Sequence, residues 1–271
     1  MKNTRSELYK ILSLPLFWRG VAIVIGITVF FTFQNIQVIN AIANGNTEIL
    51  MLEDTTSQLT EFQTVRDAVL SSPYQSSILF FPILFALILS TEYKFGQESL
   101  TKLLTPKWQT ILTGQICSGI IVASTLTVAL SLINSAMLYV MLDETLQNYL
   151  SLGLVLEVTL RIIIFAITLT LLSMFLVKIT RKPIPSVIVI VSILIITLSG
   201  ILKVVSPTLE NLLPLIGAKS FVFGRVENNN PSEMYGLLLL LLLLLLSQAS
   251  IVTILMYIKG WYKNQKDKKY G

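Results

Sequence analysis

The 271-residue sequence contains no histidine, a single cysteine and few charged residues. Without histidine, the chain cannot form a histidine metal site, a Ser-His or Cys-His nucleophile pair, or the H-E-x-x-H helix of metalloproteases. The single cysteine, Cys117, excludes an internal disulfide and says nothing about the redox compartment. These absences exclude several classes of enzyme for this chain.

The shortage of charge indicates the environment in which the chain folds. Charged residues make up 13% of the sequence, about half of the roughly 25% found in soluble domains. Hydrophobic residues make up 54%, and the mean hydropathy is +0.75. Most of the chain therefore faces lipid, and we predict an all-α polytopic membrane protein with one transmembrane domain over residues 1–271.

Long apolar segments give the number of spans. A helix that crosses ~30 Å of hydrocarbon at ~1.5 Å per residue needs about 20 apolar residues. Six segments approach or exceed this length. The fifth is rich in Val and Ile, but we expect a helix because an unpaired strand would leave its backbone polar groups unsatisfied in lipid. The predicted spans are residues 17–39, 74–91, 116–142, 152–177, 186–202 and 237–258.

Lysine and arginine are distributed unequally over this layout. With both termini in the cytoplasm, the inner segments hold 15 of the 20 basic residues and four acidic residues, a net charge of +11. The outer segments hold five basic and eleven acidic residues, a net charge of −6. Because cytoplasmic loops carry an excess of Lys and Arg, we predict cytoplasmic N and C termini. The net charge of +5 then reflects topology and contact with anionic lipid, not nucleic-acid binding.

The two ends of the chain are expected on the inner membrane surface. Residues 1–16 are charged and carry Leu8, Ile11 and Leu12 at helical spacing. This pattern predicts an interfacial amphipathic helix that leads into the first span at Pro15. No cleavable signal peptide is expected. Residues 259–271 are predicted to form a basic cytoplasmic tail.

Two outer segments are longer than a simple connection. Residues 40–73 carry five acidic residues against Arg66, which predicts one or two short amphipathic helices in an acidic extracellular cap. This cap is either a solvated face or a binding site for a cationic substrate. Residues 204–236 are too apolar for a water-exposed loop and too interrupted by proline and glycine for a crossing. We predict a re-entrant or interfacial pair of short helices buried against protein.

Small and polar residues within the spans indicate helix contacts. The third span carries Gly119, Ala123, Thr127, Ser131 and Ser135 at four-residue intervals. Small residues at this spacing let helices approach closely, so we predict packing inside the chain. The alternatives are the lining of a path, in which Thr127 and Ser131 are candidate residues, or a seam between two copies.

A pair of opposite charges lies in the outer part of the fourth span. Glu157 and Arg161 are one helical turn apart, which predicts an i,i+4 ion pair. A paired charge at that depth is expected to face protein or a water-filled cavity and not lipid. The pair is either a structural contact or part of a gate or substrate path.

The inner loop between the second and third spans, residues 92–114, contains a short amphipathic pattern. After Gly96, Glu98 and Lys102 form an i,i+4 pair of favourable order, and Pro106 ends the helix. Such a helix lies parallel to the membrane and needs a partner, which is either lipid headgroups or a groove on a soluble protein. Its apolar face is formed by Leu100, Leu103 and Leu104.

The whole layout resembles an ATP-binding-cassette permease of type 2. The resemblance covers the six spans, the amphipathic start, the inner loop after the second span and the apolar segment before the sixth. In that family the loop has an acidic residue, a glycine and a leucine-rich helix that ends in proline and a basic residue. Members commonly have Ser-Arg and Lys where this sequence has Trp108-Gln109 and Gln115. The matching residues are Glu92, Gly96, Leu103, Leu104, Pro106 and Lys107.

The resemblance implies a permease subunit in a bacterial plasma membrane, not an enzyme. The sequence has no G-x-x-x-x-G-K-[ST] phosphate loop. A separate nucleotide-binding subunit would therefore bind ATP and Mg, and a second permease chain, identical or paralogous, would complete the transporter. The segment that couples ATP hydrolysis to the spans would comprise Glu92, Gly96, Glu98, Leu100, Leu103, Leu104, Pro106 and Lys107.

The length of the outer loop and the family resemblance indicate the class of substrate. The long outer loop favours the branch of the family that exports peptides, drugs or sodium, and we expect an antimicrobial or cytolytic peptide, with drug or sodium efflux as the alternative. An ion-coupled secondary transporter and a toxin-sequestering immunity protein are the alternatives of another class. The spans contain neither a midplane acid nor an internal repeat, which disfavours the secondary transporter.

Overall fold

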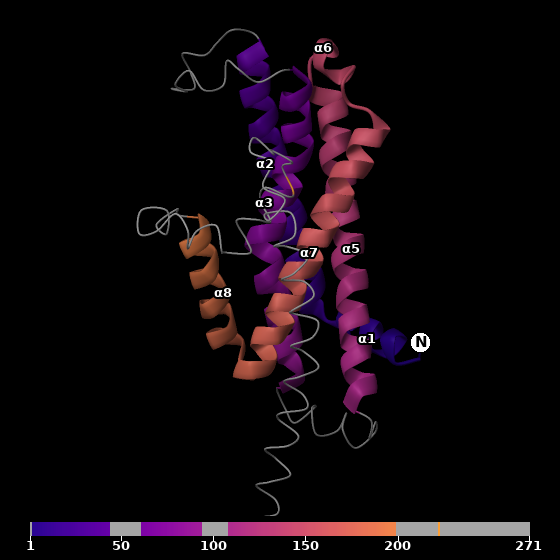
Figure 1. The fold of residues 1–271 in the computed structure, drawn as a ribbon, viewed down its shortest axis with the longest axis vertical. Coiled ribbons are helices and arrows are strands. Elements are labelled where there is room, and N and C mark those ends of the chain that lie inside the picture. The colour runs from indigo at the N-terminus through magenta and orange to yellow at the C-terminus, as the bar shows by residue number, and fades with distance from the viewer. Residues whose placement is uncertain (1, 44–60, 94–107, 199–221, 223–271) are drawn as a thin grey trace, which may run out of the picture.

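The computed structural model describes residues 2–43, 61–93, 108–198 and 222, and every element within these ranges is a helix. Four long helices lie side by side along the long axis of the molecule (Figure 1). They contain 29 to 34 residues each, so they are roughly 43 to 51 Å long at ~1.5 Å per residue. The described part is thus a helical membrane protein with four helices long and apolar enough to span a bilayer. They are α2 (Pro15–Ala43), α3 (Glu61–Ser90), α5 (Trp108–Met141) and α7 (Leu152–Thr180).

Shorter helices lie at the ends and side of this bundle. The amphipathic start is confirmed as α1 (Lys2–Ser13), which lies at one end of the bundle and packs mainly on α5. The turn η3 (Thr91–Tyr93) follows α3 at the same end, and α6 (Glu144–Gln147) lies at the opposite end. Helix α8 (Pro183–Leu198) packs against α3 and α7.

The first, third and fourth predicted spans are confirmed as parts of α2, α5 and α7. Each of these helices extends beyond its predicted span at one or both ends. Helix α5 begins at Trp108, so residues 108–114 of the predicted inner loop are helical.

Helix α3 begins well before the predicted second span. Helix α3 begins at Glu61 and continues through Pro73 and Pro82, so the outer loop does not extend to residue 73. Proline lacks an N–H and usually ends a helix. Burial overrides that tendency, since Val65 and Leu70 are fully buried in the core on the outer side of Pro73. Residues 44–60 of the predicted cap lie outside the described residues.

The last two predicted spans are described only in part. Helix α8 has 16 residues, so it is roughly 24 Å long and shorter than the ~30 Å hydrocarbon layer. The sixth predicted span, the basic tail and all of the segment 204–236 except Val222 lie outside the described residues. Val222 is fully buried in the main core. The six-span layout therefore stays a prediction.

Burial differs strongly among the long helices. About two thirds of the apolar window of α3 and 61% of that of α7 are buried, whereas only 22% of that of α2 is buried. Helices α3 and α7 are thus the centre of the described bundle, and α2 presents most of its apolar surface outward.

The described charges divide between the two ends of the bundle. Among the charged residues whose side chains the structure describes, the end that carries α1 has six basic side chains and one carboxylate, and the opposite end has five carboxylates and two arginines. This division agrees in sign with the predicted orientation, in which the basic end faces the cytoplasm. The first group is Arg5, Glu7, Lys10, Arg19, Lys178, Arg181 and Lys182, and the second is Glu61, Arg66, Asp67, Asp143, Glu144, Glu157 and Arg161.

Candidate functional site

The predicted coupling segment begins and ends at the basic end of the bundle. Its first residue, Glu92, is the middle residue of η3, directly after α3. The hydroxyl of Thr91 in this turn donates a hydrogen bond to the Ile88 carbonyl at 2.7 Å. The described chain resumes at Trp108, the first residue of α5. The remaining predicted coupling residues, Gly96, Glu98, Leu100, Leu103, Leu104, Pro106 and Lys107, lie outside the described residues.

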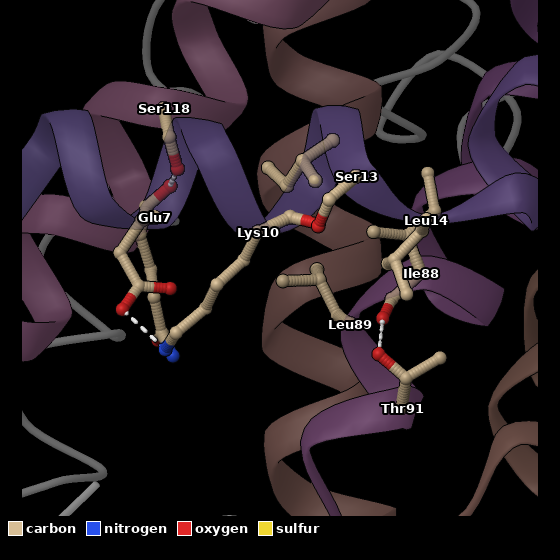
Figure 2. Close-up of a pocket in the computed structure, with 10 residues that line it drawn as sticks. Glu7, Lys10, Ser13, Leu14, Ile88, Leu89, Thr91 and Ser118 are labelled. Atoms are coloured by element: carbon tan, nitrogen blue, oxygen red, sulfur yellow. Dashed lines mark hydrogen bonds and ion pairs between the residues drawn. The ribbon is translucent and has the colours of Figure 1, made fainter.

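A cavity of about 180 Å³ lies next to this turn, between α1, the end of α3 and the first turns of α5 (Figure 2). Glu7 on α1 is 7% exposed, and its Oε1 lies 2.7 Å from Lys10 Nζ. The Lys10 side chain is 42% exposed. From α5, Gln115 and Ser118 line the cavity and are buried. Helix α1, an ion pair and a buried polar wall thus line the cavity where the predicted coupling segment starts.

Three hydroxyl groups line the same cavity, and each donates its proton to a backbone carbonyl three residues earlier. Ser13 donates to Lys10 at 2.9 Å, Ser118 to Gln115 at 2.9 Å, and Thr91 to Ile88 at 2.7 Å. A hydroxyl has one proton, so these oxygens retain only acceptor capacity.

At the opposite end, the predicted ion pair between Glu157 and Arg161 is confirmed, with Arg161 Nη2 at 2.7 Å from Glu157 Oε1. Arg66 on α3 also approaches this carboxylate, with its Nη2 at 3.8 Å from Glu157 Oε1. The Glu157 side chain is 51% exposed, so the contact lies at the edge of the bundle and links α3 to α7. Sequence reasoning missed Arg66 because it assigned this residue to the outer cap.

A second contact at the acidic end involves Tyr149, between α6 and α7. Its hydroxyl donates a hydrogen bond to Glu61 at the start of α3. This bond and the negative charge of Glu61 raise the pKa of Tyr149 above its ordinary value of 10.0. Like Arg66, Tyr149 thus joins the outer end of α3 to its neighbours.

Thr127 and Ser131, the candidate path residues of α5, are buried inside the bundle. The Thr127 hydroxyl donates to the Ala123 carbonyl at 2.8 Å. The Ser131 hydroxyl has no hydrogen-bond partner in the structure. These two residues lie in a closed interior, whereas Glu157 is half-exposed at the edge, so the four predicted residues occupy two different environments.

The small-residue stripe of α5 packs on α7 at Gly119. A Cβ atom at Gly119 would lie 3.2 Å from Met174 Sδ and 3.5 Å from Thr170 Cγ2. The two backbones therefore approach more closely than a larger residue would allow. Packing inside the chain is confirmed at this position.

A hydrogen-bonded cluster between α2, α3 and α5 was not predicted. Asn134 Nδ2 donates to the Val69 carbonyl at 2.8 Å and lies 3.3 Å from the Ala68 carbonyl. Its Oδ1 accepts a hydrogen bond from the Thr32 hydroxyl at 2.7 Å. One buried amide of α5 thus connects all three helices.

Pro73 explains why Asn134 lies there. In an α-helix the Val69 carbonyl accepts from the N–H of residue 73, but proline has no N–H. The Asn134 side chain supplies the missing donor from the neighbouring helix. The available signal was an asparagine within the third predicted span and a proline directly before the second, although pairing them required knowledge of the helix register.

The described residues contain no group of three or more His, Cys, Asp or Glu side chains that could hold a metal ion. No known protein family, curated protein or solved structure matches the chain.

Proposed function

We propose that this chain is the membrane subunit of an ATP-driven exporter similar to ATP-binding-cassette permeases of type 2. The observation that carries the proposal is the end of the bundle at which the coupling segment starts and finishes. That end is basic, bears the amphipathic α1 and contains both Tyr93 and Trp108, which flank the segment 94–107. A cytoplasmic ATPase subunit would meet the chain there.

The connections of this segment support a mechanical role. It continues directly from α3 through η3 and leads directly into α5. Helix α3 packs on α2, α5, α7 and α8, so a displacement of its inner end would reach every long helix described. ATP binding by the partner would favour one access state over the other, and the segment would carry the difference in interaction free energy.

The proposed complex contains two permease chains and an ATPase subunit that binds ATP and Mg in a bacterial plasma membrane. We propose an antimicrobial or cytolytic peptide as the substrate, because an amphipathic peptide can enter from the bilayer that surrounds the outward-facing apolar surface of α2. Drug or sodium efflux is the second candidate within the same class.

The proposal is tested by export or resistance in a strain that lacks the gene, complemented with variants. We expect Gly96→Glu and the double variant Leu103→Glu/Leu104→Glu to abolish export while the protein still inserts in the membrane. Thr145→Glu is the matched control, because Thr145 is exposed at the opposite end and a charge there leaves the coupling segment intact. Unchanged export by the coupling variants would contradict the proposal.

A further inference from the structure

The cavity beneath α1 lies at the depth of lipid headgroups. Helix α1 lies across the end of the bundle, while the four long helices run along its long axis (Figure 1). Tyr9 and Trp18 are 75% and 58% exposed near the cavity, and Trp18 Nε1 donates to the Leu12 carbonyl at 2.8 Å. Exposed tyrosine and tryptophan are enriched at the membrane–water interface, which places the cavity there.

The polar groups of the cavity are suited to a donor with positive charge. The buried group with formal charge is the Glu7 carboxylate. The hydroxyls of Ser13, Thr91 and Ser118 have donated their protons to carbonyls, so their remaining lone pairs accept hydrogen bonds. Away from the half-exposed Lys10 at the edge, an anion would meet the Glu7 carboxylate and oxygen lone pairs, whereas a primary ammonium with three N–H donors would meet acceptors.

An ammonium group of the chain already occupies such a position beside the Glu7 carboxylate. The Lys10 ammonium lies 2.7 Å from Glu7 Oε1 at the edge of the cavity (Figure 2), and its side chain is 42% exposed. Lys10 can therefore turn toward the water and pair with a phosphate while a second ammonium takes its place on Glu7. The other wall is apolar and includes Ile11, Leu14 and Ile88, which suit the glycerol and acyl part of a lipid.

We propose that this cavity binds the headgroup of an aminophospholipid of the phosphatidylethanolamine type. Glu7 accepts hydrogen bonds from the primary ammonium, and Lys10 pairs with the phosphate. The inference goes beyond the proposed transport function and does not depend on it, because it concerns this chain and the bilayer alone.

The test uses the full chain in nanodiscs of phosphatidylcholine in which part of the lipid is replaced by phosphatidylethanolamine or by its mono- and dimethylated forms. Each methyl group removes one N–H donor and keeps the charge. We expect the apparent affinity for the lipid to fall at least about tenfold from the primary to the quaternary ammonium, because the quaternary group has no N–H donor and the loss of even one charge-assisted hydrogen bond gives about that ratio. Thermal unfolding in each lipid mixture measures the preference.

Glu7→Gln is expected to abolish this preference, and Glu144→Gln at the opposite end is expected to preserve it. If Glu7→Gln does not fold, the wild-type protein is purified from an equal mixture of phosphatidylethanolamine and phosphatidylcholine, and the lipids that it retains are identified by mass spectrometry. We expect phosphatidylethanolamine to be enriched. Equal retention of both lipids, or a preference that survives in Glu7→Gln, would overturn the proposal. Equal stabilisation by free ethanolamine in phosphatidylcholine discs would overturn the assignment to a lipid.

Discussion

Asn134 shows how one side chain can stabilise a membrane helix that contains a proline. Its Nδ2 donates to the Val69 carbonyl, which Pro73 deprives of its helical donor, and its Oδ1 accepts from Thr32. Asn134 and Thr32 are fully buried, so an unpaired partner would have no water to bond. The sequence contains both the proline and the asparagine, but a single sequence does not reveal that they face each other across two helices.

Asn134→Leu should destabilise the bundle by about 0.6 to 2 kcal/mol, the range for hydrogen bonds between membrane helices. Pro73→Ala restores an N–H at residue 73, so the cost of Asn134→Leu should fall in that background. A double-mutant cycle of unfolding in detergent measures this coupling. Pro82→Ala is the matched control and should give no rescue. Equal costs of Asn134→Leu in all three backgrounds would contradict the account.

The contact between Tyr149 and Glu61 predicts that the stability of the protein depends on pH. The neutral phenol is the form that bonds Glu61, so its contribution to stability is complete below the ordinary pKa of 10.0. That contribution is lost as the pH rises through the raised pKa of the folded protein. Phenolate absorbance should show a component of raised pKa that is lost in Tyr149→Phe and that returns toward 10.0 in Glu61→Gln. An unchanged titration in both variants would contradict the contact.

At the scale of elements, two glycines lie in different environments: one packs against a neighbouring helix, and the other faces open space. Gly119 faces Met174 and Thr170 on α7, whereas a Cβ at Gly26 on α2 would meet nothing within 4 Å. Long apolar runs predicted the first, third and fourth helices well because hydrophobic length is a local property. The start of α3 was placed too late because residues 61–73 are polar and acidic in sequence, whereas several of their side chains are buried in the core.

Gly119→Ile should therefore destabilise the protein by about 1 to 3 kcal/mol, the usual cost of overpacking a core. Gly119→Ala should cost less, since the flexible Met174 side chain can shift by a few tenths of an ångström. Gly26→Ile is the matched control and should be tolerated. Thermal unfolding of the three variants in one detergent provides the comparison, and equal effects of isoleucine at both glycines would refute the assigned contact with α7.

At the scale of the whole molecule, the separation of basic and acidic residues between the two ends of the bundle predicts its orientation in the membrane. The basic end collects α1, the end of α3 and the start of α8, and the acidic end collects α6 and the start of α7. Counting lysines and arginines along the sequence predicted this division because it needs only the alternation of spans. The count could not show that Arg66 and Glu157 meet at one end, which depends on the pairing of α3 with α7.

The orientation is testable by labelling with a membrane-impermeant maleimide in intact cells after Cys117→Ser removes the native thiol. Thr145→Cys, at the acidic end, should be labelled from outside. Lys182→Cys, at the basic end, should be labelled only after permeabilisation. Both residues are exposed, so accessibility alone does not favour either one. The reverse pattern would place the basic end outside and contradict the positive-inside orientation.

The central claim is that this chain works with a separate ATPase that meets its basic end. The most direct measurement is the ATP hydrolysis that co-purifies with the tagged full-length chain in nanodiscs. The account predicts a bound ATPase subunit with substantial activity, and loss of both in Leu103→Glu/Leu104→Glu but not in Thr145→Glu. A chain that exports its substrate with no associated ATPase, and with no dependence on ATP, would contradict it.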